Sequence, residues 1–321
     1  VLEVLAEQTG VGKVFTLSAD GLGSLIDALP IHTHSFKEVA RGKDDLAAFL
    51  YTSGTTGRSK GAMLTHDNLV SNAQSLCQCW HFDNTDVLIH ALPLFHIHGL
   101  FVATNVTLSA GSSMIFMPRF DSEMIISLMS RATVLMGVPT FYVRLLETAN
   151  LCAATVAPMR LFISGSAPLL AETHKQWQEV TGTAILERYG MTETNMNTSN
   201  PYEGERRAGT VGKPLPGVEV RIADADSGKP LAQGEIGSVE IRGPNVFAGY
   251  WQMPEKTKQE FRDDGFFITG DIGTIDGDNY LSIVGRSKDL IISGGYNVYP
   301  KEIEIILDDV EGVYESAIIG V

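Results

Sequence analysis

The segment at residues 51–61, YTSGTTGRSKG, contains residue types that suit a polyphosphate. Its glycines leave backbone N–H groups free to point outward, its serine and threonine hydroxyls can donate hydrogen bonds, and Lys60 supplies a cation. The spacing of Gly54, Gly57 and Lys60 differs from the P-loop pattern of glycine, four residues and then Gly-Lys-Ser/Thr. The chemistry predicts a nucleoside triphosphate as the substrate class, and a flexible linker is the alternative interpretation.

Two predicted elements flank this segment. The apolar run at residues 45–50 predicts a buried strand, and Thr65 is a suitable N-cap for a helix that continues to about Trp80. The segment would then connect a strand to a helix, which is a common position for phosphate recognition.

The composition predicts a soluble globular protein. Of its 321 residues, 44% are hydrophobic and 19% are charged, which is enough for a sizeable core and for two or three domains. The net charge of −14 argues against nucleic acid and anionic membranes as main partners, so a nucleotide would need a local basic site. The chain has no apolar run of about 18 residues, so we expect no membrane span.

Cysteine usage and the two ends of the chain bear on compartment and completeness. Cys77, Cys79 and Cys152 are odd in number, and we expect ordinary buried thiols in a reducing compartment rather than disulfides or zinc ligands. We therefore expect the cytoplasm, or the mitochondrial matrix if a targeting segment precedes the chain. Both ends resemble the middle of a domain, so we expect a piece of a longer protein.

The pattern along the chain predicts an α/β protein with three parts. Residues 1–207 alternate apolar runs with helical patterns, which predicts a parallel sheet with helices on both faces. Residues 208–287 predict a small antiparallel β-barrel, and residues 288–321 predict a hinge and the start of a small α+β domain. The candidate strands lie at residues 86–90, 113–117, 133–136, 161–164, 218–222, 237–242 and 280–284, and the candidate helices at 122–130, 171–181 and 300–307.

Four further segments could contribute to a nucleotide site. The small residues at 164–168 would let a flat ring approach the backbone, although an ordinary turn is the simpler interpretation. Residues 189–193, YGMTE, place an aromatic ring, a hydroxyl and a carboxylate together, which suits base stacking, phosphate binding and Mg²⁺ ligation. Asp271 could accept hydrogen bonds from ribose, and Arg286 adds a cation. The alternatives here are a core tyrosine at a strand end and a polar turn.

Together and in this order, these segments resemble the adenylate-forming superfamily of acyl-CoA synthetases, luciferases and peptide-synthetase adenylation domains. The resemblance extends from about residue 45 to the end of the chain. It implies an enzyme that uses ATP with Mg²⁺ and, in the acyl-CoA synthetases, coenzyme A (CoA). The nucleotide-binding residues that it implies are Thr52, Ser53, Gly54, Thr55, Thr56, Gly57, Lys60, Ser164, Gly165, Ser166, Ala167, Pro168, Glu187, Arg188, Tyr189, Gly190, Met191, Thr192, Asp271 and Arg286.

The same resemblance implies narrower roles. It implies that Thr56 and Glu193 hold Mg²⁺. Lys288 matches the hinge between the large and small domains of the family. The catalytic groups that it implies are Lys60, His96, Thr192 and Glu193, and the CoA-binding residues are Ser293, Gly294 and Gly295.

The resemblance also implies a two-step reaction. A carboxylate attacks the α-phosphorus of ATP and releases pyrophosphate, and a thiol then takes the acyl group from the adenylate after the small domain has rotated. The family has a catalytic lysine near its C-terminus, and the chain ends before that position. We therefore expect this chain alone to be weakly active or inactive in adenylation, because a positioned cation at a developing charge is usually a large contribution.

The residues expected around the acyl group favour a short dicarboxylic acid. Residues 93–99, PLFHIHG, resemble the acyl-pocket segment of the family, which implies that His96 and His98 contact the acyl group. Arg188 stands where many relatives have a glycine, and an arginine there would shorten the pocket and bind a second carboxylate in bidentate fashion. Malonate fits best, since a fatty chain would meet a buried cation. The segments that closely resemble malonyl-CoA synthetases are residues 136–144, 187–198 and 201–204.

Other interpretations stay open. Arg188 could form a surface ion pair with Glu187 or Glu193, and Arg206 or Arg207 could bind the carboxylate instead. The acid could be another short or aryl acid, or the chain could be a nucleotide-binding module without catalysis.

The histidines are not expected to form a metal site, and three of them have no predicted role. His96 and His98 have a spacing that occurs in metal sites, but no third ligand with suitable spacing is present. His32, His34 and His174 are expected at the surface or in loops. An NAD enzyme is disfavoured, because no Gly-x-Gly-x-x-Gly follows a predicted strand.

Overall fold

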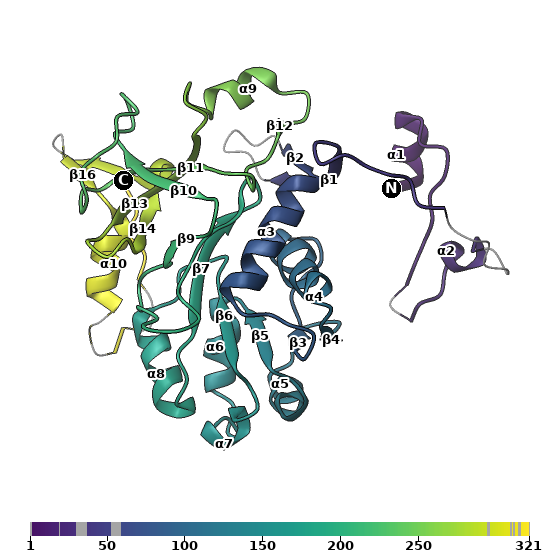
Figure 1. Ribbon diagram of the computed structural model, residues 1–321, viewed down its shortest axis with the longest axis horizontal. Coiled ribbons are helices and arrows are strands. Elements are labelled where there is room, and N and C mark those ends of the chain that lie inside the picture. Colours follow the sequence, from purple (N-terminus) through teal and green to yellow (C-terminus); the bar gives the residue numbers. More distant parts are fainter. Residues whose placement is uncertain are drawn as a thin grey trace. The chain divides into compact units, whose positions relative to one another are not determined.

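The computed structural model describes residues 2–18, 20–29, 37–52, 59–293, 296–308, 310, 312–313 and 316–320. The contacts between residues divide the chain into two compact units, Val1–Arg41 and Gly42–Val321. The first unit contains the helices α1 (Leu2–Thr9) and α2 (Ser24–Asp27). The second unit contains every sheet of the described residues (Figure 1), and the predicted site residues fall within its bounds. The domain boundaries expected at residues 207 and 287 stay predictions.

A seven-stranded sheet forms the centre of the second unit (Figure 1). Its strands stand in the order β4 (Ser113–Phe116), β3 (Val87–His90), β5 (Val134–Gly137), β6 (Leu161–Ser164), β7 (Leu186–Met191), β8 (Asn195–Ser199) and β9 (Lys213–Pro214). The pairs from β4 to β7 are parallel, and β8 and β9 are antiparallel to their neighbours. Every residue of β5 and β6 is buried, as is typical of parallel strands covered on both faces. The predicted parallel sheet is confirmed.

Helices connect these strands. The first of them, α3 (His66–Cys79), begins with a capping box in which the Thr65 hydroxyl accepts from the Asn68 N–H and the Asn68 side chain accepts from the Thr65 N–H. The predicted N-cap is therefore confirmed. The helices that follow are the π-helix η1 (His98–Ala103), α4 (Thr104–Ser109), α5 (Ser122–Leu128), the 3-10 turn η2 (Met129–Arg131), α6 (Pro139–Leu146), α7 (Ala153–Val156) and α8 (Ala171–Thr181).

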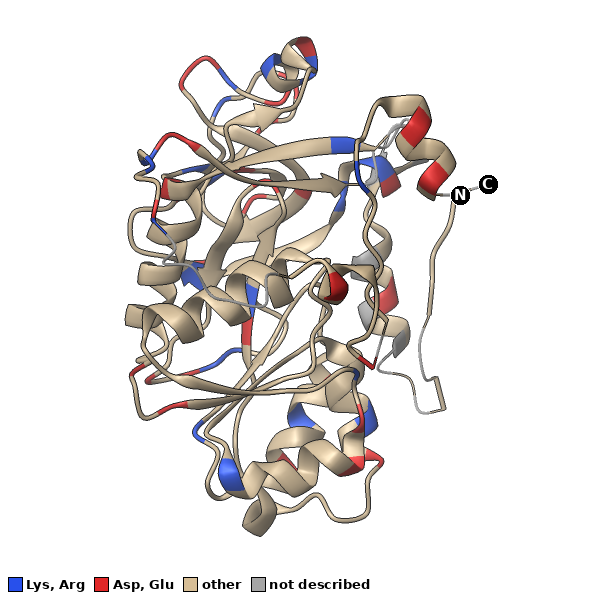
Figure 2. Cartoon of the chain, turned by 90° about the vertical axis from the view of Figure 1, so that its right-hand side faces the viewer, with Lys and Arg blue, Asp and Glu red and all other residues tan. Residues whose placement is uncertain are grey.

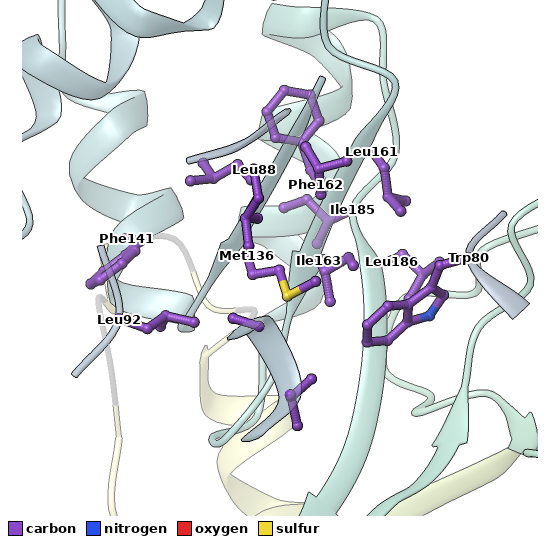
Figure 3. Packing of buried hydrophobic residues seen from close by; sticks show 14 of the residues in the cluster. Trp80, Leu88, Leu92, Met136, Phe141, Leu161, Phe162, Ile163, Ile185 and Leu186 are labelled. Carbon is purple, nitrogen blue, oxygen red and sulfur yellow. The ribbon is translucent and has the colours of Figure 1, made fainter. Parts of the chain in front are cut away.

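The main core packs side chains of neighbouring strands against aromatic residues of the helices (Figure 3). Phe162 of β6 is buried, and the fully buried Trp177 of α8 packs edge-on against it with ring centroids 4.9 Å apart. Trp177 packs in the same way against Tyr142 of α6, at 5.1 Å. These contacts fix the position of β6 and of the turn that follows it, because well-packed aromatic rings leave little freedom to shift.

The later antiparallel part is an open sheet rather than a closed barrel. Four strands pair in the order β10 (Glu219–Ala223), β11 (Gly237–Arg242), β13 (Phe267–Ile275) and β14 (Leu281–Arg286). Among the described residues the outer strands β10 and β14 do not pair with each other. Four short strands are too few to close around a filled interior, for which about eight strands are typical. The predicted α/β class with an added antiparallel part is confirmed, without barrel closure.

The predicted phosphate-binding segment connects two antiparallel strands, and not a strand and a helix. The strands β1 (Leu46–Thr52) and β2 (Lys60–Thr65) pair from Thr52 opposite Lys60 outward, and β12 (Gly249–Tyr250) pairs with the other edge of β2. The expectation of a buried first strand is wrong. Residues of β1 are exposed or half-buried, because an antiparallel edge strand buries one face at most. Residues 53–58 of the segment lie outside the described residues.

The end of the second unit follows the prediction closely. The strands β15 (Ile291–Ser293) and β16 (Tyr296–Val298) pair antiparallel, and the helix α10 (Pro300–Asp308) begins at the predicted proline. One further short helix, α9 (Pro254–Gln259), precedes β13. No helix in the described part of the chain is long and apolar enough to cross a membrane. Acidic and basic residues are interspersed along the elements in Figure 2.

The three cysteines are free thiols. Cys77 and Cys79 are half-buried on α3, and burial raises their pKa values. The expectation of buried thiols is wrong for Cys152, which is exposed because it precedes the short surface helix α7.

Candidate functional site

Several predicted site residues lie where β6 ends beside the first residues of β7. Ser164, the last residue of β6, pairs with Glu187 of β7, so the turn at residues 165–168 lies beside Arg188. Ligands of open parallel sheets bind at this edge. Gly165 shows how close the two segments are, since a Cβ placed on it would lie 2.5 Å from the Cζ of Arg188. The missing side chain at Gly165 therefore makes room for the guanidinium.

Arg188 has a buried guanidinium with free hydrogen-bonding capacity. Its exposed fraction is 3%, and its Nε and Nη2 have no hydrogen-bond partner among the described residues. Burial lowers the pKa of Arg188 from 12.5 to about 9, because the charged form loses its hydration, and only the nearby Tyr142 hydroxyl acts in the opposite direction. A buried cation is stable in a protein only when it is paired. The geometry therefore fits an anion that can accept two hydrogen bonds, such as a carboxylate.

The two alternative arginines, Arg206 and Arg207, bind other partners. Arg206 donates three hydrogen bonds, to the backbone carbonyls of residues 184, 201 and 202. Arg207 forms ion pairs with three exposed or half-exposed acids, Glu205, Asp276 and Asp278. Neither arrangement leaves a guanidinium free for a substrate.

Glu187 does not pair with Arg188. Its Oε1 lies 3.5 Å from the Nδ1 of His174 on α8, and both side chains are buried. The expectation that His174 lies at the surface is wrong, because the face of α8 that carries His174 and Trp177 packs into the core. Burial raises the pKa of Glu187, although His174 lowers it in part.

His98 is the predicted acyl-site histidine that the structure places beside Arg188. Its exposed fraction is 3%, its Nδ1 lies 3.2 Å from the Oγ of Ser166, and its Nε2 has no partner among the described residues. Burial, together with the charges of Arg188 and His90, lowers the pKa of His98 well below its usual range. The ring is therefore neutral at pH 7 and can donate one hydrogen bond. His96, in contrast, has an exposed side chain beside Phe95.

The residues predicted for adenine and ribose form one connected group. Asp271 is buried, and its Oδ1 lies 2.7 Å from the Nε of Arg286, its register partner on β14. Its other oxygen accepts a hydrogen bond from the Tyr189 hydroxyl, from a residue 82 positions earlier in the chain. Burial raises the pKa of Asp271 despite these two neighbours, and burial with Asp271 raises the pKa of Tyr189. The structure thus joins the three residues, and their role at the nucleotide stays a prediction.

Lys60 and Glu193 share a second hydrogen-bonded cluster. Lys60 Nζ lies 2.9 Å from the Tyr250 hydroxyl and 3.3 Å from Glu260 Oε1. Glu193 is 4% exposed and its Oε1 accepts from the Tyr250 hydroxyl at 2.9 Å and from Thr52 Oγ1 at 3.4 Å. Tyr250 and Glu260 were not predicted from the sequence, because no short motif contains them together with Lys60 or Glu193.

Three further predicted residues lie at the end of β7 and in the turn that follows it. Gly190 and Met191 end β7, and Thr192 follows in the turn before β8. A Cβ on Gly190 would lie 1.9 Å from the carbonyl oxygen of Asn195, so no other residue fits this position without moving the backbone. The turn after β6 contains Ser166 with φ +73, and Ala167 and Pro168 are exposed.

The predicted hinge and CoA-binding residues lie at the end of the second unit. Lys288 is exposed in the 3-10 turn η3 (Ser287–Asp289) that links β14 to β15. Ser293 ends β15. Gly294 and Gly295 lie outside the described residues, as do the loop residues Ser53, Gly54, Thr55, Thr56 and Gly57.

The residues present fit a Mg²⁺ ion that is held largely by its substrate. Magnesium in nucleotide sites usually keeps several waters and binds one or two carboxylates together with phosphate oxygens. Glu193 supplies one buried carboxylate, and Thr56 would supply a hydroxyl. Among the described residues no group of three or more histidine, cysteine and acidic side chains could hold a metal by itself.

Comparison with known proteins identifies the family. Residues 4–251 match the AMP-binding enzyme family, and the chain belongs to that family. It is 40% identical to a malonate–CoA ligase of Arabidopsis thaliana in an alignment of 307 residues that covers 89% of this chain and 50% of that protein. It is 42% identical to a probable CoA ligase of Humulus lupulus in an alignment of 295 residues that covers 85% of this chain and 48% of that protein.

A solved structure is more similar still. ATP-bound MatB from Rhodopseudomonas palustris superposes with a TM-score of 0.96 at 63% sequence identity, over 99% of this chain and 63% of that one. The chain spans about half the length of the curated relatives that it matches. The predicted resemblance to the adenylate-forming superfamily, with malonate–CoA ligases among the relatives, is confirmed.

Proposed function

We propose that the chain is the nucleotide- and acid-binding part of an ATP-dependent acid–CoA ligase, and that the acid is malonate. The reaction forms malonyl-adenylate from malonate and ATP with release of pyrophosphate, and then malonyl-CoA from the adenylate and CoA with release of AMP. The buried guanidinium of Arg188, with two nitrogens unpartnered among the described residues, is the observation that supports this acid. The similarity to a malonate–CoA ligase agrees with it.

Arg188 would discriminate between acids, because malonate pairs with its guanidinium and a monocarboxylic acid leaves that charge unpaired. One carboxylate of malonate attacks ATP, and the other pairs with the guanidinium and repays the cost of burying that charge. His98 stands beside this second carboxylate as a neutral donor. A monocarboxylic or fatty acid would leave the guanidinium unpaired in an apolar contact, and sites with buried polar groups reject such analogues by several orders of magnitude.

The adenylation step depends on positioned charges. The attacking carboxylate oxygen forms a bond to the α-phosphorus while the bond to the bridging oxygen of pyrophosphate breaks. Lys60 and the hydroxyl of Thr192 contact the triphosphate, and Asp271 accepts from the ribose hydroxyls. Glu193, with the hydroxyl of Thr56, would hold Mg²⁺, which would supply positive charge to balance the departing pyrophosphate. In the second step the small domain rotates about Lys288, and residues 293–295 line the path of the CoA thiol.

The test is an acid panel with the full-length protein. Malonate should support release of AMP and pyrophosphate at a much higher kcat/KM than acetate, an aryl acid or a medium-chain fatty acid. The substitution Arg188→Gly should lower kcat/KM for malonate about a hundredfold or more, since it removes a charge-assisted bidentate pair. Arg207→Gly is the matched control, because Arg207 pairs with surface acids.

Three outcomes contradict parts of the proposal. An unchanged malonate kcat/KM in Arg188→Gly eliminates Arg188 as the carboxylate partner. A wild-type preference for a fatty or aryl acid eliminates malonate as the substrate. ATP binding without turnover of any acid indicates a nucleotide-binding module.

A further inference from the structure

The hydroxyl of Tyr250 lies between three charged side chains. It is 2.9 Å from Lys60 Nζ, 2.9 Å from Glu193 Oε1 and 2.6 Å from Glu260 Oε2. Lys60 and Glu193 stand on different elements and are the cation and the carboxylate proposed to flank the triphosphate. One buried hydroxyl therefore contacts both groups, and Tyr250 itself is only 2% exposed.

The position of this hydroxyl is set by the core and not by a substrate. The Tyr250 ring packs edge-on against Phe247 with centroids 4.8 Å apart, and Phe247 packs in turn against Phe267 at 5.3 Å. The backbone of Tyr250 is fixed as well, because β12 pairs with β2 through Tyr250 opposite Ala62 and the Tyr250 N–H donates to Thr257 Oγ1 at 2.9 Å. The ring cannot turn without breaking these contacts.

Hydrogen-bond capacity couples the three charged groups. A tyrosine hydroxyl has one proton to donate and can accept as well, whereas a lysine ammonium can only donate. The hydroxyl therefore accepts from Lys60 and gives its single proton to Glu193 or to Glu260. Glu260 has a second cation, since Lys256 Nζ lies 2.8 Å from its Oε1. Glu260 can therefore release both Lys60 and the Tyr250 proton without being left unpaired.

We propose that Tyr250 is a positioning residue for triphosphate binding. Its hydroxyl holds the Lys60 ammonium and the Glu193 carboxylate in a fixed relation before ATP binds. This inference rests on the proposed function. When ATP binds, Lys60 exchanges Glu260 for a phosphate oxygen, and Glu260 remains paired with Lys256. The Tyr250 hydroxyl then donates its proton to Glu193 alone. This hydrogen bond keeps the Glu193 carboxylate oriented for the ion that accompanies ATP. Such preorganisation removes ordering costs from the binding step.

The test compares Tyr250→Phe with Tyr280→Phe in the full-length protein. Both substitutions remove one hydroxyl from a nearly buried ring, but the Tyr280 hydroxyl donates to the backbone carbonyl of Glu205 at 3.0 Å and contacts neither Lys60 nor Glu193. Tyr250→Phe should lower kcat/KM for ATP about tenfold or more, which is the usual effect of losing a hydrogen bond to a charged group. It should also raise the Mg²⁺ concentration for half-maximal rate and leave the KM for malonate unchanged. Tyr280→Phe should alter none of these.

Equal dependence on ATP and Mg²⁺ in Tyr250→Phe and wild type overturns the inference, and so does an equal effect in Tyr280→Phe. If Tyr250→Phe does not fold, Glu260→Gln decides the question. It removes the acid that competes for Lys60 and leaves the hydroxyl in place, so it should lower the KM for ATP, and an increase contradicts the inference.

A failure of the proposed function can be distinguished from a failure of the inference about Tyr250. If the wild-type protein does not activate malonate, calorimetry with ATP and Mg²⁺ still decides the role of Tyr250. Weaker binding to Tyr250→Phe than to Tyr280→Phe supports it, and equal binding overturns it.

Discussion

Replacing Arg188 with methionine should make this chain more stable while it removes the proposed carboxylate partner. The guanidinium is 3% exposed, and two of its nitrogens lack partners among the described residues. Methionine retains an unbranched apolar stem that adapts to irregular space, without the charge. The cost of burying an unpaired cation then disappears. The substitution should therefore raise the free energy of unfolding and lower the affinity for the acid.

The magnitude follows from the pKa. Burial lowers the pKa of Arg188 from 12.5 to about 9, and at ~1.4 kcal/mol per pH unit this corresponds to roughly 5 kcal/mol. Packing lost around the guanidinium offsets part of this, so we expect a net gain of about 2–3 kcal/mol in the free energy of unfolding at pH 7. Because the folded-state pKa lies below the unfolded-state value, the cost is complete at pH 7. It shrinks only as the pH rises through 9 towards 12.5, so the difference between the variants should narrow at high pH.

Urea denaturation at pH 7 and pH 10 measures this difference. Arg206→Met is the matched control, because Arg206 donates to three backbone carbonyls. Its removal should destabilise the chain by about 1–3 kcal/mol, because it leaves three partly buried acceptors without their donor. Malonate should stabilise the wild-type chain and should have no effect on Arg188→Met, because a ligand shifts the unfolding equilibrium only when it binds the folded state.

Two results would refute this reasoning. If Arg188→Met destabilises the chain as much as Arg206→Met, the guanidinium is paired in solution and its burial carries no cost. If malonate stabilises Arg188→Met as strongly as wild type, the acid binds elsewhere.

Three further predictions concern other parts of the site. Gly165→Ala places a Cβ 2.5 Å from the Cζ of Arg188. It should raise the KM for malonate about tenfold in an AMP-release assay without altering the KM for ATP. An unchanged malonate KM would show that the guanidinium can move aside. Asp271→Asn removes the charge that pairs with Arg286 and should weaken ATP binding about tenfold in calorimetry, whereas unaltered affinity contradicts the ribose role. Lys288→Pro in the full-length protein should impair thioester formation and spare pyrophosphate release, and an equal loss in both half-reactions contradicts the hinge assignment.

Elements that depend on neighbours in the chain could be predicted from the sequence. The N-cap at Thr65 and the strand at residues 161–164 are examples, since both depend on a few adjacent residues. Residues 60–65 were not recognised as a strand, because that strand exists through pairing with β1 and with β12, which lies far along the chain. The expected barrel is open for a related reason, since closure depends on whether distant edge strands meet.

The site shows the same division. Sequence patterns predicted Lys60, Glu193 and Asp271, because their roles follow from residue type within short motifs. Tyr250 stands 190 residues after Lys60 and 57 after Glu193, and only the folded chain brings its hydroxyl between them. No local pattern marks such a residue.

The sequence by itself determined the family and predicted the nucleotide chemistry, because ordered short motifs carry that information without reference to packing. It also placed an arginine at residue 188, but it left open whether that arginine forms a surface ion pair or faces a substrate. Only the tertiary structure excluded the surface ion pair, and the role of Arg188 towards a substrate stays a proposal. The contact with Gly165 and the packing of β6 and β7 bury the guanidinium, and the surrounding acids and arginines bind other partners. Burial and pairing are properties of residues that meet in space, and a linear pattern does not contain them.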